Sequence, residues 1–377
     1  MTRHRVAIVG AGIGAEHLEG FLANVERFDV AAICDLDEAR AKPLVRRARE
    51  EGSSAHYVRD LDSLLSDRSL DIIDICLPPQ MHKQAILKAL AANKHVVCEK
   101  PLVASLAEID EVADAVSNTD RLLMPVFQYR FGNGMGALLD LIEAGHAGKP
   151  LVATVETHWN RLSDYYDVPW RGKWATELGG AVVGHAIHNH DLLTRVLGPM
   201  ASVQAELATR ANPIETEDCA SIVYRMSNGA LVTSSVTLGS ARDQSRFRFC
   251  FEHLTAESGL EAYNPGTSPW QFQARADESS RRGSQAAIDA VVAAHVPHTE
   301  GYARQFEQLD QALRGQAALP VTLGDARGSL ELITAIYRAD AMGQRVTLPL
   351  SLDSPGYADW SVAARTGTES SIRSPTG

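Results

Sequence analysis

The sequence predicts an α/β fold in two domains, the first built on a parallel sheet and the second on an open, mainly antiparallel sheet. Three observations carry this prediction. The chain has 377 residues, more than one hydrophobic core normally serves, so two domains are expected. Strands and helices alternate over the first third of the chain, as βαβ units do. After about residue 127 the chain instead shows strands with period-two patterning, which is typical of antiparallel sheets.

The expected strands of the first domain are short apolar runs separated by segments of helical composition. These strands cover residues 5–9, 30–34, 72–76, 95–98 and 122–125, with helices at 14–25, 38–51 and 83–92. Consecutive parallel strands need right-handed crossovers. Their carboxyl ends therefore lie along one edge of the sheet, where ligands of open α/β sheets bind.

The second domain is expected to hold strands at 151–156, 202–208, 220–225, 230–237 and 246–252, faced by helices at 185–197, 300–314 and 324–342. Ser227-Asn228-Gly229 predicts a hairpin turn between two of these strands. The predicted limits are 1–126 for the first domain, 127–350 for the second and 351–377 for a tail. The tail is rich in Ser, Thr, Gly and Pro, so we expect it to be disordered or loosely draped beyond about Trp360.

Composition excludes several classes of protein. No apolar run approaches the roughly 18 residues of a membrane span, and the apolar stretch near the N-terminus breaks at Gly10, too early for a signal peptide. The five cysteines are scattered through strand-like segments, which predicts reduced thiols in a cytoplasmic protein and no disulfide framework or zinc site. A net charge of −11 argues against nucleic-acid and anionic-membrane partners.

A glycine-rich loop follows the first expected strand and opens the first helix. It reads Gly10-Ala11-Gly12-Ile13-Gly14-Ala15. Gly10 allows a tight turn, Gly12 lets the backbone approach a pyrophosphate, and the helix N-terminus that follows attracts its charge. Glycine spacing alone is weak evidence, but a strand before the loop and a helix after it supply the context that the motif requires. The sequence predicts a dinucleotide-binding loop.

An acid at the end of the second strand indicates which dinucleotide binds. Asp35 lies 21 residues after Gly14, where a carboxylate accepts hydrogen bonds from the ribose hydroxyls and repels a 2′-phosphate. No arginine follows immediately to receive that phosphate, because Arg40 lies a turn into the next helix. NAD is therefore predicted in preference to NADP.

The strand at 95–98 ends in Glu99-Lys100-Pro101. Lys100 is therefore expected at the carboxyl edge of the parallel sheet, where burial can lower its pKa toward the range useful for proton transfer. Taken alone, the tripeptide is more typical of a surface lysine at the start of a loop.

Several motifs, in order along the chain, together resemble the Gfo/Idh/MocA oxidoreductase family, named for glucose–fructose oxidoreductase, inositol dehydrogenase and rhizopine catabolism. They are the glycine loop followed by His17, Pro78-Pro79-x-x-His82, 94–101 with its Glu-Lys-Pro, Gln128-Tyr129-Arg130-Phe131, Gly179-Gly180 followed by His188-x-x-Asp191, and a closing segment from Val321 to Pro349. The resemblance covers roughly residues 4–350. It implies a Rossmann domain, NAD(P)-dependent chemistry on sugars or cyclitols, and dimers or tetramers that associate through the second sheet.

The resemblance also implies roles for individual residues. Lys100 would contact the reacting hydroxyl, and His188 would remove its proton. Glu99 would position the nicotinamide ribose or the Lys100 ammonium. The further cofactor contacts carried over or inferred nearby are Gly10, Gly12, Ile13, Gly14, Asp35, Pro78, His82, Gln128 and Arg171. His17, Tyr129 and Arg130 are expected to line the substrate cleft.

The segment 184–191 departs from the family pattern. Many relatives carry an aspartate four residues before the histidine base, where this chain has Gly184, followed by His185, His188 and His190. Three interpretations are open. In the first, His188 is the base, His185 assists it and Asp191 orients an imidazole. In the second, some of these histidines are packed core residues. In the third, His185 and His188, with His158 or Asp191, bind a divalent metal. No companion motif supports the metal, so none is predicted.

Aromatic and polar residues alternate between 158 and 174, including His158, Asn160, Trp170 and Arg171. Such a mixture suits both a sugar site and a subunit interface. The sequence therefore predicts a cytoplasmic, homo-oligomeric NAD-dependent dehydrogenase acting on a secondary hydroxyl of a sugar, glycoside or cyclitol. Two alternatives remain: the same fold with bound, recycled NAD that carries out oxidoreduction between sugars or oxidation-assisted glycoside cleavage, and a non-catalytic NAD-dependent sensor.

Overall fold

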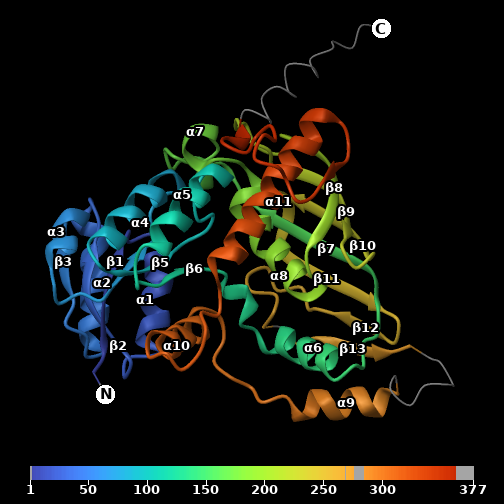
Figure 1. Ribbon diagram of the computed structural model, residues 1–377, viewed down its shortest axis with the longest axis horizontal. Helices are drawn as coiled ribbons and strands as arrows, with labels where there is room; N and C mark the ends of the chain where they lie inside the picture. The colour runs from blue at the N-terminus through green and yellow to red at the C-terminus, as the bar shows by residue number, and fades with distance from the viewer. Residues whose placement is uncertain (1, 268, 276–283, 362–377) are drawn as a thin grey trace, which may run out of the picture. The chain divides into compact units, whose positions relative to one another are not determined.

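The computed structural model describes residues 2–267, 269–275 and 284–361. The chain forms two compact units (Figure 1). The first unit comprises Met1–Gln128 and Thr299–Arg327, and the second comprises Tyr129–His298 and Gly328–Gly377. The boundary after Gln128 falls two residues beyond the predicted one. The first unit also includes the later segment Thr299–Arg327, which was predicted in the second domain.

The first unit contains a six-stranded parallel sheet in the order β3-β2-β1-β4-β5-β6. Its strands are β1 His4–Val9, β2 Phe28–Cys34, β3 His56–Val58, β4 Ile72–Ile75, β5 His95–Cys98 and β6 Leu123–Pro125. Every residue of β2 and β4 is buried, as expected for parallel strands covered on both faces. Strand order reverses between β1 and β4, and this reversal defines the crevice where doubly wound sheets bind ligands.

The helices that connect these strands end and begin at recognisable caps. They are α1 Gly14–Leu22, α2 Glu38–Glu50, α3 Leu61–Ser66, α4 His82–Ala91 and α5 Leu106–Ser117. Asp37, Asp60 and Ser105 each accept a hydrogen bond from a backbone N–H in the first turn of α2, α3 and α5, which satisfies one of the helix donors that would otherwise lack a partner.

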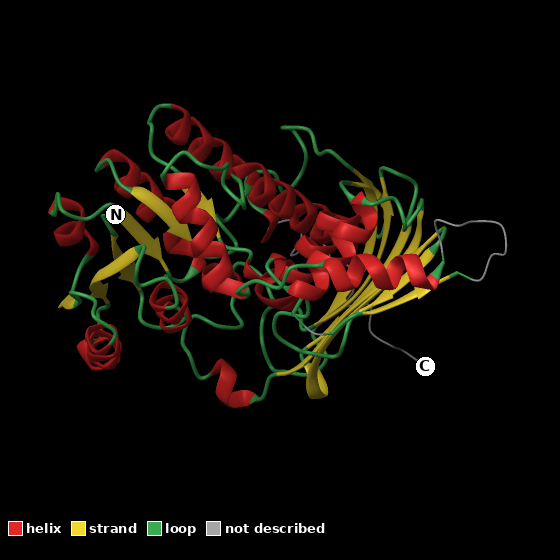
Figure 2. Ribbon diagram, turned by 90° about the horizontal axis from the view of Figure 1, so that it is seen from below, coloured by secondary structure: helices red, strands yellow, loops and turns green. Residues whose placement is uncertain are grey.

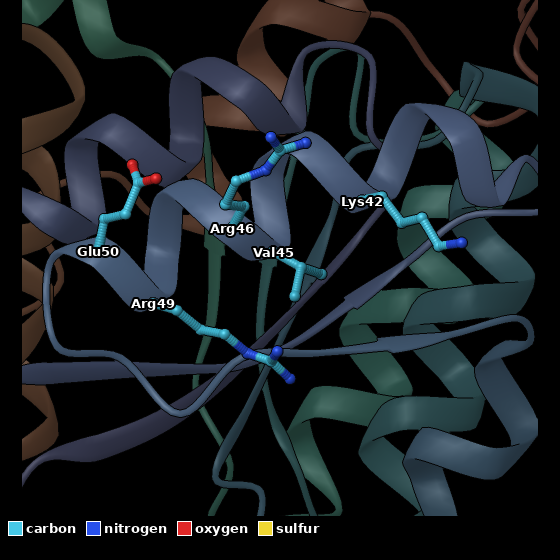
Figure 3. A pocket seen from close by; sticks show the side chains of 5 residues that line it. All are labelled: Lys42, Val45, Arg46, Arg49 and Glu50. Atoms are coloured by element: carbon cyan, nitrogen blue, oxygen red, sulfur yellow. The ribbon is translucent and has the colours of Figure 1, made fainter.

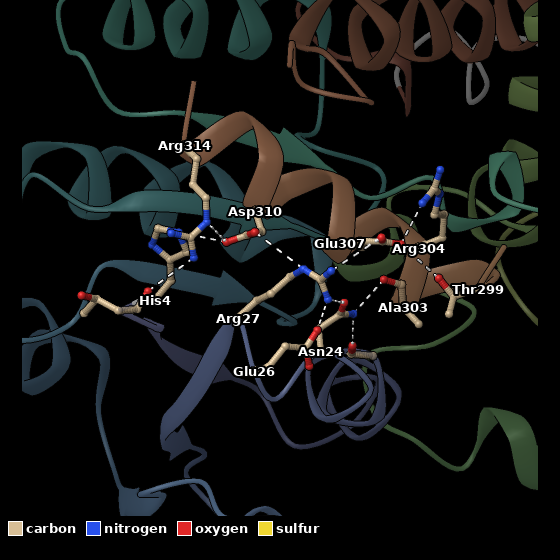
Figure 4. Close-up of polar contacts among 12 residues, drawn as sticks. His4, Asn24, Glu26, Arg27, Thr299, Ala303, Arg304, Glu307, Asp310 and Arg314 are labelled. Atoms are coloured by element: carbon tan, nitrogen blue, oxygen red, sulfur yellow. Dashed lines mark hydrogen bonds and ion pairs between the residues drawn. The ribbon is translucent and has the colours of Figure 1, made fainter. Parts of the chain in front are cut away.

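Helix α10, Gly301–Leu313, packs within the first unit. Phe306 stacks on Phe21 of α1 with ring centroids 4.0 Å apart, and Gln305 Nε2 donates to the Pro125 carbonyl at 2.9 Å. Asn24 Nδ2 also donates to the Ala303 carbonyl at 2.8 Å (Figure 4). The prediction that residues 300–314 face the second sheet is therefore wrong, because the apolar face of this helix meets α1.

The second unit contains an eight-stranded sheet in the order β13-β12-β11-β7-β10-β9-β8-β14, with every neighbouring pair antiparallel except β7 and β10. Its strands are β7 Pro150–Asn160, β8 Met200–Ala208, β9 Cys219–Met226, β10 Leu231–Thr237, β11 Gly239–Phe251, β12 Leu254–Glu257, β13 Gln271–Ala274 and β14 Val346–Thr347. The predicted hairpin turn joins β9 to β10, and Gly229, at φ +94°, donates from its N–H to the Met226 carbonyl.

The helices of this unit include α6 Asn133–Glu143, α7 Trp174–Glu177, α8 Ile187–Leu197 and α9 Gln285–Ala294. Helix α11, Leu323–Met342, begins in the first unit and continues into the second. Figure 2 shows the sheet in yellow with helices against one face. Asn189 of α8 donates hydrogen bonds from Nδ2 to the Thr157 and Ser245 hydroxyls on that face. Alternate strand residues such as Val152, Val223 and Leu231 are about half exposed on the other face.

The described chain ends in a packed residue of the second unit. Trp360 is 1% exposed, and its Nε1 donates to the Leu178 carbonyl at 2.6 Å. The disorder expected beyond it falls on residues 362–377, which lie outside the described residues. Among the helices of the described residues, none has both the length and the hydropathy that crossing a bilayer requires.

We predict that Phe306→Ala lowers the free energy of unfolding by about 3–5 kcal/mol, because it removes a buried ring that joins α10 to α1. Urea denaturation measures this change. Leu36→Ala is the control, since Leu36 is 79% exposed and its loss is expected to change stability by less than about 0.5 kcal/mol. Equal losses in the two variants would contradict the packing of α10 on α1.

Candidate active site

The glycine loop lies between the end of β1 and the start of α1. Gly10 has φ +106°, and a Cβ built there would overlap the Cys76 carbonyl oxygen at the end of β4. A Cβ on Gly14 would lie 2.8 Å from Cγ2 of Ile8, so the third glycine permits close packing of helix on strand. Ile13 is 42% exposed at the loop. These positions provide the close backbone approach that a pyrophosphate needs.

Asp35 links the end of β2 to the glycine loop. Its Oδ2 accepts a hydrogen bond from the Ala11 N–H at 2.7 Å, and its Oδ1 accepts one from the Asp37 N–H at 2.8 Å. Each carboxylate oxygen has a second lone pair for a ribose hydroxyl. Arg40 lies nearer than the sequence suggested, with Nη2 3.4 Å from the Cβ position of Gly12. An extended arginine reaches back across a helical turn, which residue spacing alone does not show.

Glu99 and Lys100 follow β5, and a buried hydrogen-bond network surrounds the Glu99 carboxylate. Its Oε1 accepts from His17 Nε2 at 3.0 Å and from the Tyr302 hydroxyl at 3.1 Å. Its Oε2 accepts from the Lys100 backbone N–H at 3.0 Å. Gln128 Nε2 donates to the Tyr302 hydroxyl at 3.0 Å. Gln128 therefore supports this network in addition to any contact with a cofactor.

His17 is completely buried between two carboxylates. Its Nδ1 lies 2.9 Å from Asp74 Oδ2 on β4, while its Nε2 faces Glu99. Burial alone lowers the pKa of His17, but the charge of Asp74 opposes it, and the pKa is raised well above 6.5. With both ring nitrogens engaged and 0% exposure, His17 has no face for a sugar. Its placement does not support the predicted role in substrate binding.

His17, Asp74 and Cys76 form a group whose donor atoms lie within 4.8 Å of one another, the spacing of a possible metal site. The Cys76 sulfur lies 3.4 Å from His17 Nδ1 and 3.6 Å from an Asp74 oxygen, and Asp74 is 2.9 Å from that nitrogen. These are hydrogen-bond distances. Burial raises the pKa of the Cys76 thiol, so the sulfur is a poor ligand in this arrangement.

His82 holds the other end of the Glu99-Lys100-Pro101 segment. It lies at the start of α4, is 0% exposed, and places its ring nitrogens 2.9 Å from the Pro101 carbonyl oxygen and 2.8 Å from that of Leu77. Burial lowers the pKa of His82, so the neutral ring donates to one of these carbonyls. His82 therefore packs between the turn after β4, which contains Pro78, and the turn after β5, and its one ring N–H anchors one of these turns. A direct contact of its ring with the cofactor is not supported by this burial.

The histidine-rich segment of the second unit begins with a wide π-helical turn, Val182–Ala186, that leads into α8. Glu217 caps this turn, because its carboxylate accepts hydrogen bonds from the N–H groups of Gly180 and Val182 and from the Tyr337 hydroxyl. Burial raises the pKa of Glu217 to about 7. The π turn and this cap have no short sequence signature, and the sequence-based prediction missed both.

His188 and Asp191 lie on α8 and meet residues from the segment after β6. The His188 ring stacks on Tyr129 with centroids 4.4 Å apart. Arg130 donates two hydrogen bonds to the Asp191 carboxylate, at 2.7 and 2.6 Å, and both side chains are nearly fully buried. The structure thus brings together four predicted site residues in two pairs.

His185 belongs to a different polar cluster, formed with Tyr165, Arg171 and Glu177. The Tyr165 hydroxyl lies 3.1 Å from His185 Nε2 and also accepts from Arg171. Burial raises the pKa of Tyr165 to about 12, so the hydroxyl keeps its proton. Arg171 packs over the ring of Trp170 and lies 3.5 Å from Glu177.

The space beside Gly184 is occupied by an acid from another element. A Cβ on Gly184 would lie 3.7 Å from Oε1 of Glu177, the C-terminal residue of α7. Glu177 is 5% exposed, and its Oε2 accepts from the Gly172 N–H at 2.5 Å. A carboxylate therefore lies next to the position where the resemblance expects an aspartate. Sequence spacing could not show this, because residues 177 and 184 approach through the turn between them.

Three further residues of the predicted region take other positions. His190 is packed in the core, where its Nε2 meets the Tyr224 and Ser234 hydroxyls and burial lowers its pKa to about 4. His158 contacts Ser235 on the face of β7 opposite Thr157, which faces α8. The grouping of His158 with the helix histidines is therefore not formed. Asn160 is bonded through its backbone to Asp243 and Arg161.

A separate surface hollow lies on α2, lined by Lys42, Val45, Arg46, Arg49 and Glu50 (Figure 3). Its lining includes none of the predicted site residues, and its charged side chains surround one buried valine. We assign it no part in cofactor binding or proton transfer.

A parallel sheet whose first strand ends in this glycine loop, with Asp35 at the end of the second, defines an NAD-binding Rossmann domain. The family model "Oxidoreductase family, NAD-binding Rossmann fold" matches residues 4–127, and "GFO/IDH/MocA C-terminal domain" matches residues 135–257. Together the two matches cover more than half of the chain. The chain belongs to the Gfo/Idh/MocA family and is an oxidoreductase of that family.

Relatives named as dehydrogenases are about a quarter identical to the chain over the aligned segments. Myo-inositol 2-dehydrogenase from Thermotoga maritima is 26% identical over 60% of this chain and 66% of its own length. D-apiose dehydrogenase from Rhizobium rhizogenes is 28% identical over 61% and 64%. The chain thus spans slightly less than two thirds of these relatives. WlbA dehydrogenase from Bordetella pertussis, solved with NADH and UDP-GlcNAcA, is 27% identical with a TM-score of 0.79, covering 93% of this chain and 99% of its own.

We predict that Gly10→Ala abolishes measurable NAD binding, because its methyl group would overlap the Cys76 carbonyl and displace the loop. Gly52→Ala is the matched control: Gly52 also has a positive φ, +81°, but has no heavy atom within 4 Å of its Cβ position. Titration calorimetry with NAD measures both variants. Wild-type affinity in Gly10→Ala would contradict the assignment of the loop.

We predict that the stability contributed by His17 depends on pH. Its pKa is raised in the folded protein, so this contribution is complete below about pH 6.5 and is lost as the pH rises through the folded pKa. His17→Asn should cost roughly 3 kcal/mol or more at pH 6 and less at pH 9. Urea unfolding at both pH values measures this, with the exposed His56→Asn as control. A cost independent of pH would show that His17 is not held as a cation.

Proposed function

We propose that the protein is an NAD-dependent dehydrogenase that oxidises a secondary hydroxyl of a sugar, glycoside or cyclitol. The observation that carries the proposal is the placement of Glu99-Lys100-Pro101 at the carboxyl edge of the sheet that also holds the glycine loop, where β4 and β5 end side by side. A cationic lysine at that edge suits a substrate whose oxygen gains negative charge as its carbon loses hydride. The activities of the related inositol and apiose dehydrogenases support the substrate class.

When bound, NAD accepts the hydride, and the residues of this chain handle the proton and the charge. Lys100 contacts the reacting oxygen and stabilises the developing alkoxide, while His188 removes the hydroxyl proton as general base. Tyr129 stacks on His188 and limits the rotation of its ring. The pair Arg130 and Asp191 fixes the chain on either side of that stack. His185 and the Glu177 carboxylate are candidate partners for further substrate hydroxyls.

The proposal includes a homodimer or homotetramer that associates through the open face of the second sheet. Val152 on β7 lies opposite Leu231 on β10, and Val223 on β9, opposite Thr233, adds a third exposed apolar residue to this face. Arg246 and Arg248 pair with Glu257 beside it. An apolar centre with charged groups at its border is typical of an interface. Free cysteines throughout the described residues favour a reducing, cytoplasmic location.

We predict that Lys100→Ala lowers turnover by about a thousandfold while NAD binding persists, because the ammonium acts on the reacting oxygen and the glycine loop is intact. NADH absorbance measures turnover in a screen of myo-inositol, D-apiose, levoglucosan and UDP-GlcNAcA. Lys88→Ala on the surface of α4 is the control and should retain full activity. Normal turnover by Lys100→Ala would contradict the mechanism, and bound NAD without net NADH would indicate a recycled cofactor.

A further inference from the structure

We infer that His17 is a positioning residue for Lys100: oriented by Asp74, it holds the Glu99 carboxylate, and Glu99 in turn fixes the backbone from which Lys100 extends. The inference rests on the proposed function only in giving Lys100 a part in the reaction. Neither His17 nor Asp74 touches substrate in this arrangement. Their effect passes through hydrogen bonds to the Glu-Lys-Pro segment.

The contacts form one continuous path across four elements of the first unit. Asp74 on β4 lies 2.9 Å from His17 Nδ1 on α1, and His17 Nε2 lies 3.0 Å from Glu99 Oε1 beyond β5. Tyr302 of α10 donates to the same Oε1 at 3.1 Å, while the Lys100 N–H donates to Oε2 at 3.0 Å. Donors thus reach both oxygens of the Glu99 carboxylate, which leaves the group little freedom to rotate.

The charges in this path are costly to bury, which argues that they do more than fill space. Asp74 and His17 are 0% exposed, and Glu99 is 5% exposed. Apolar residues of similar size often stabilise a core as well as a buried ion pair does. Asp74 also interrupts β4, whose other residues are isoleucines. At its other end the path reaches the backbone N–H of Lys100 through Glu99 Oε2. The position of the Lys100 backbone is therefore what the path restrains.

A second buried histidine restrains the same segment from its other side. His82 faces the carbonyl oxygens of Pro101 and Leu77. The segment is therefore held at Glu99 by hydrogen bonds to its side chain, and at Pro101 it packs against the buried His82 ring. A proton-transfer group gains most from such restraint, since a displacement of about 1 Å can cost a hundredfold in rate.

The test compares His17→Asn and Tyr302→Phe with Asn24→Ala in the full-length protein. Asn24 is buried next to the C-terminal end of α1, the helix that carries His17. Its side chain bonds the Gly20 and Ala303 carbonyls and Arg27 (Figure 4). It therefore reproduces the loss of a buried α1–α10 contact without disturbing the path. If the three variants lose similar amounts of melting temperature, a difference between them in exchange or turnover is not a general effect of destabilisation.

Hydrogen–deuterium exchange of the Lys100 amide, followed by mass spectrometry of the peptide that contains it, is the first readout and needs no substrate. We expect roughly tenfold faster exchange in His17→Asn and Tyr302→Phe, because each removes a donor from Glu99, and no change in Asn24→Ala. The second readout is NADH formation from myo-inositol, or from UDP-GlcNAcA if only that is oxidised. We expect kcat to fall about 10- to 100-fold in His17→Asn while the KM for NAD stays within about twofold.

Unchanged exchange at Lys100 in His17→Asn would overturn the inference, as would an equal fall in kcat in Asn24→Ala. Faster exchange with an unchanged kcat would also overturn it, since the restraint would then have no consequence for turnover. A stoichiometric metal in the wild type that is lost in His17→Asn would instead assign His17, Asp74 and Cys76 to a metal site. If the wild type oxidises none of the four compounds of the screen, the proposed function loses its support, and the exchange readout alone decides whether His17 holds the Lys100 backbone.

Discussion

The ionic contact between His17, Asp74 and Glu99 is the constraint on which the rest of the first unit's site depends. A histidine with carboxylates at both ring nitrogens keeps its proton even in a buried position, and this proton fixes the Glu99 carboxylate. Because Asp74 lies in the central strand β4, the position of Glu99 is set by the most buried part of the sheet. The Glu-Lys-Pro segment is therefore restrained by the buried core, although it lies in the turn after β5.

The same strand ends also shape the cofactor loop. The Cys76 carbonyl, directly after β4, fills the space that a side chain on Gly10 would need, and the Cys76 thiol contacts His17. The turn after β4 therefore touches both the phosphate-binding loop and the network that supports Lys100. A change that displaces this turn is expected to affect cofactor binding and proton transfer together.

Local patterns predicted the elements that depend on local chemistry. The strand–loop–helix around Gly10, the position of Lys100 after β5 and the hairpin turn ending at Gly229 each follow from a few neighbouring residues, and the fold class followed from them. The assignment of residues 300–314 failed, because the partner of an amphipathic helix is decided by tertiary packing. The role of His17 was missed for a related reason: burial and the acid at Asp74 cannot be read from the glycine motif.

The most direct measurement is the protonation state of His17 in the wild-type protein. Nitrogen-15 NMR of the protein labelled at its histidines resolves whether each ring nitrogen carries a proton, and loss of one signal set in His17→Asn assigns the residue among the 13 histidines. We expect both nitrogens of His17 to remain protonated from pH 6 to pH 8. A neutral ring that titrates near pH 6.5 would contradict this, because a neutral His17 could donate to only one of the two carboxylates.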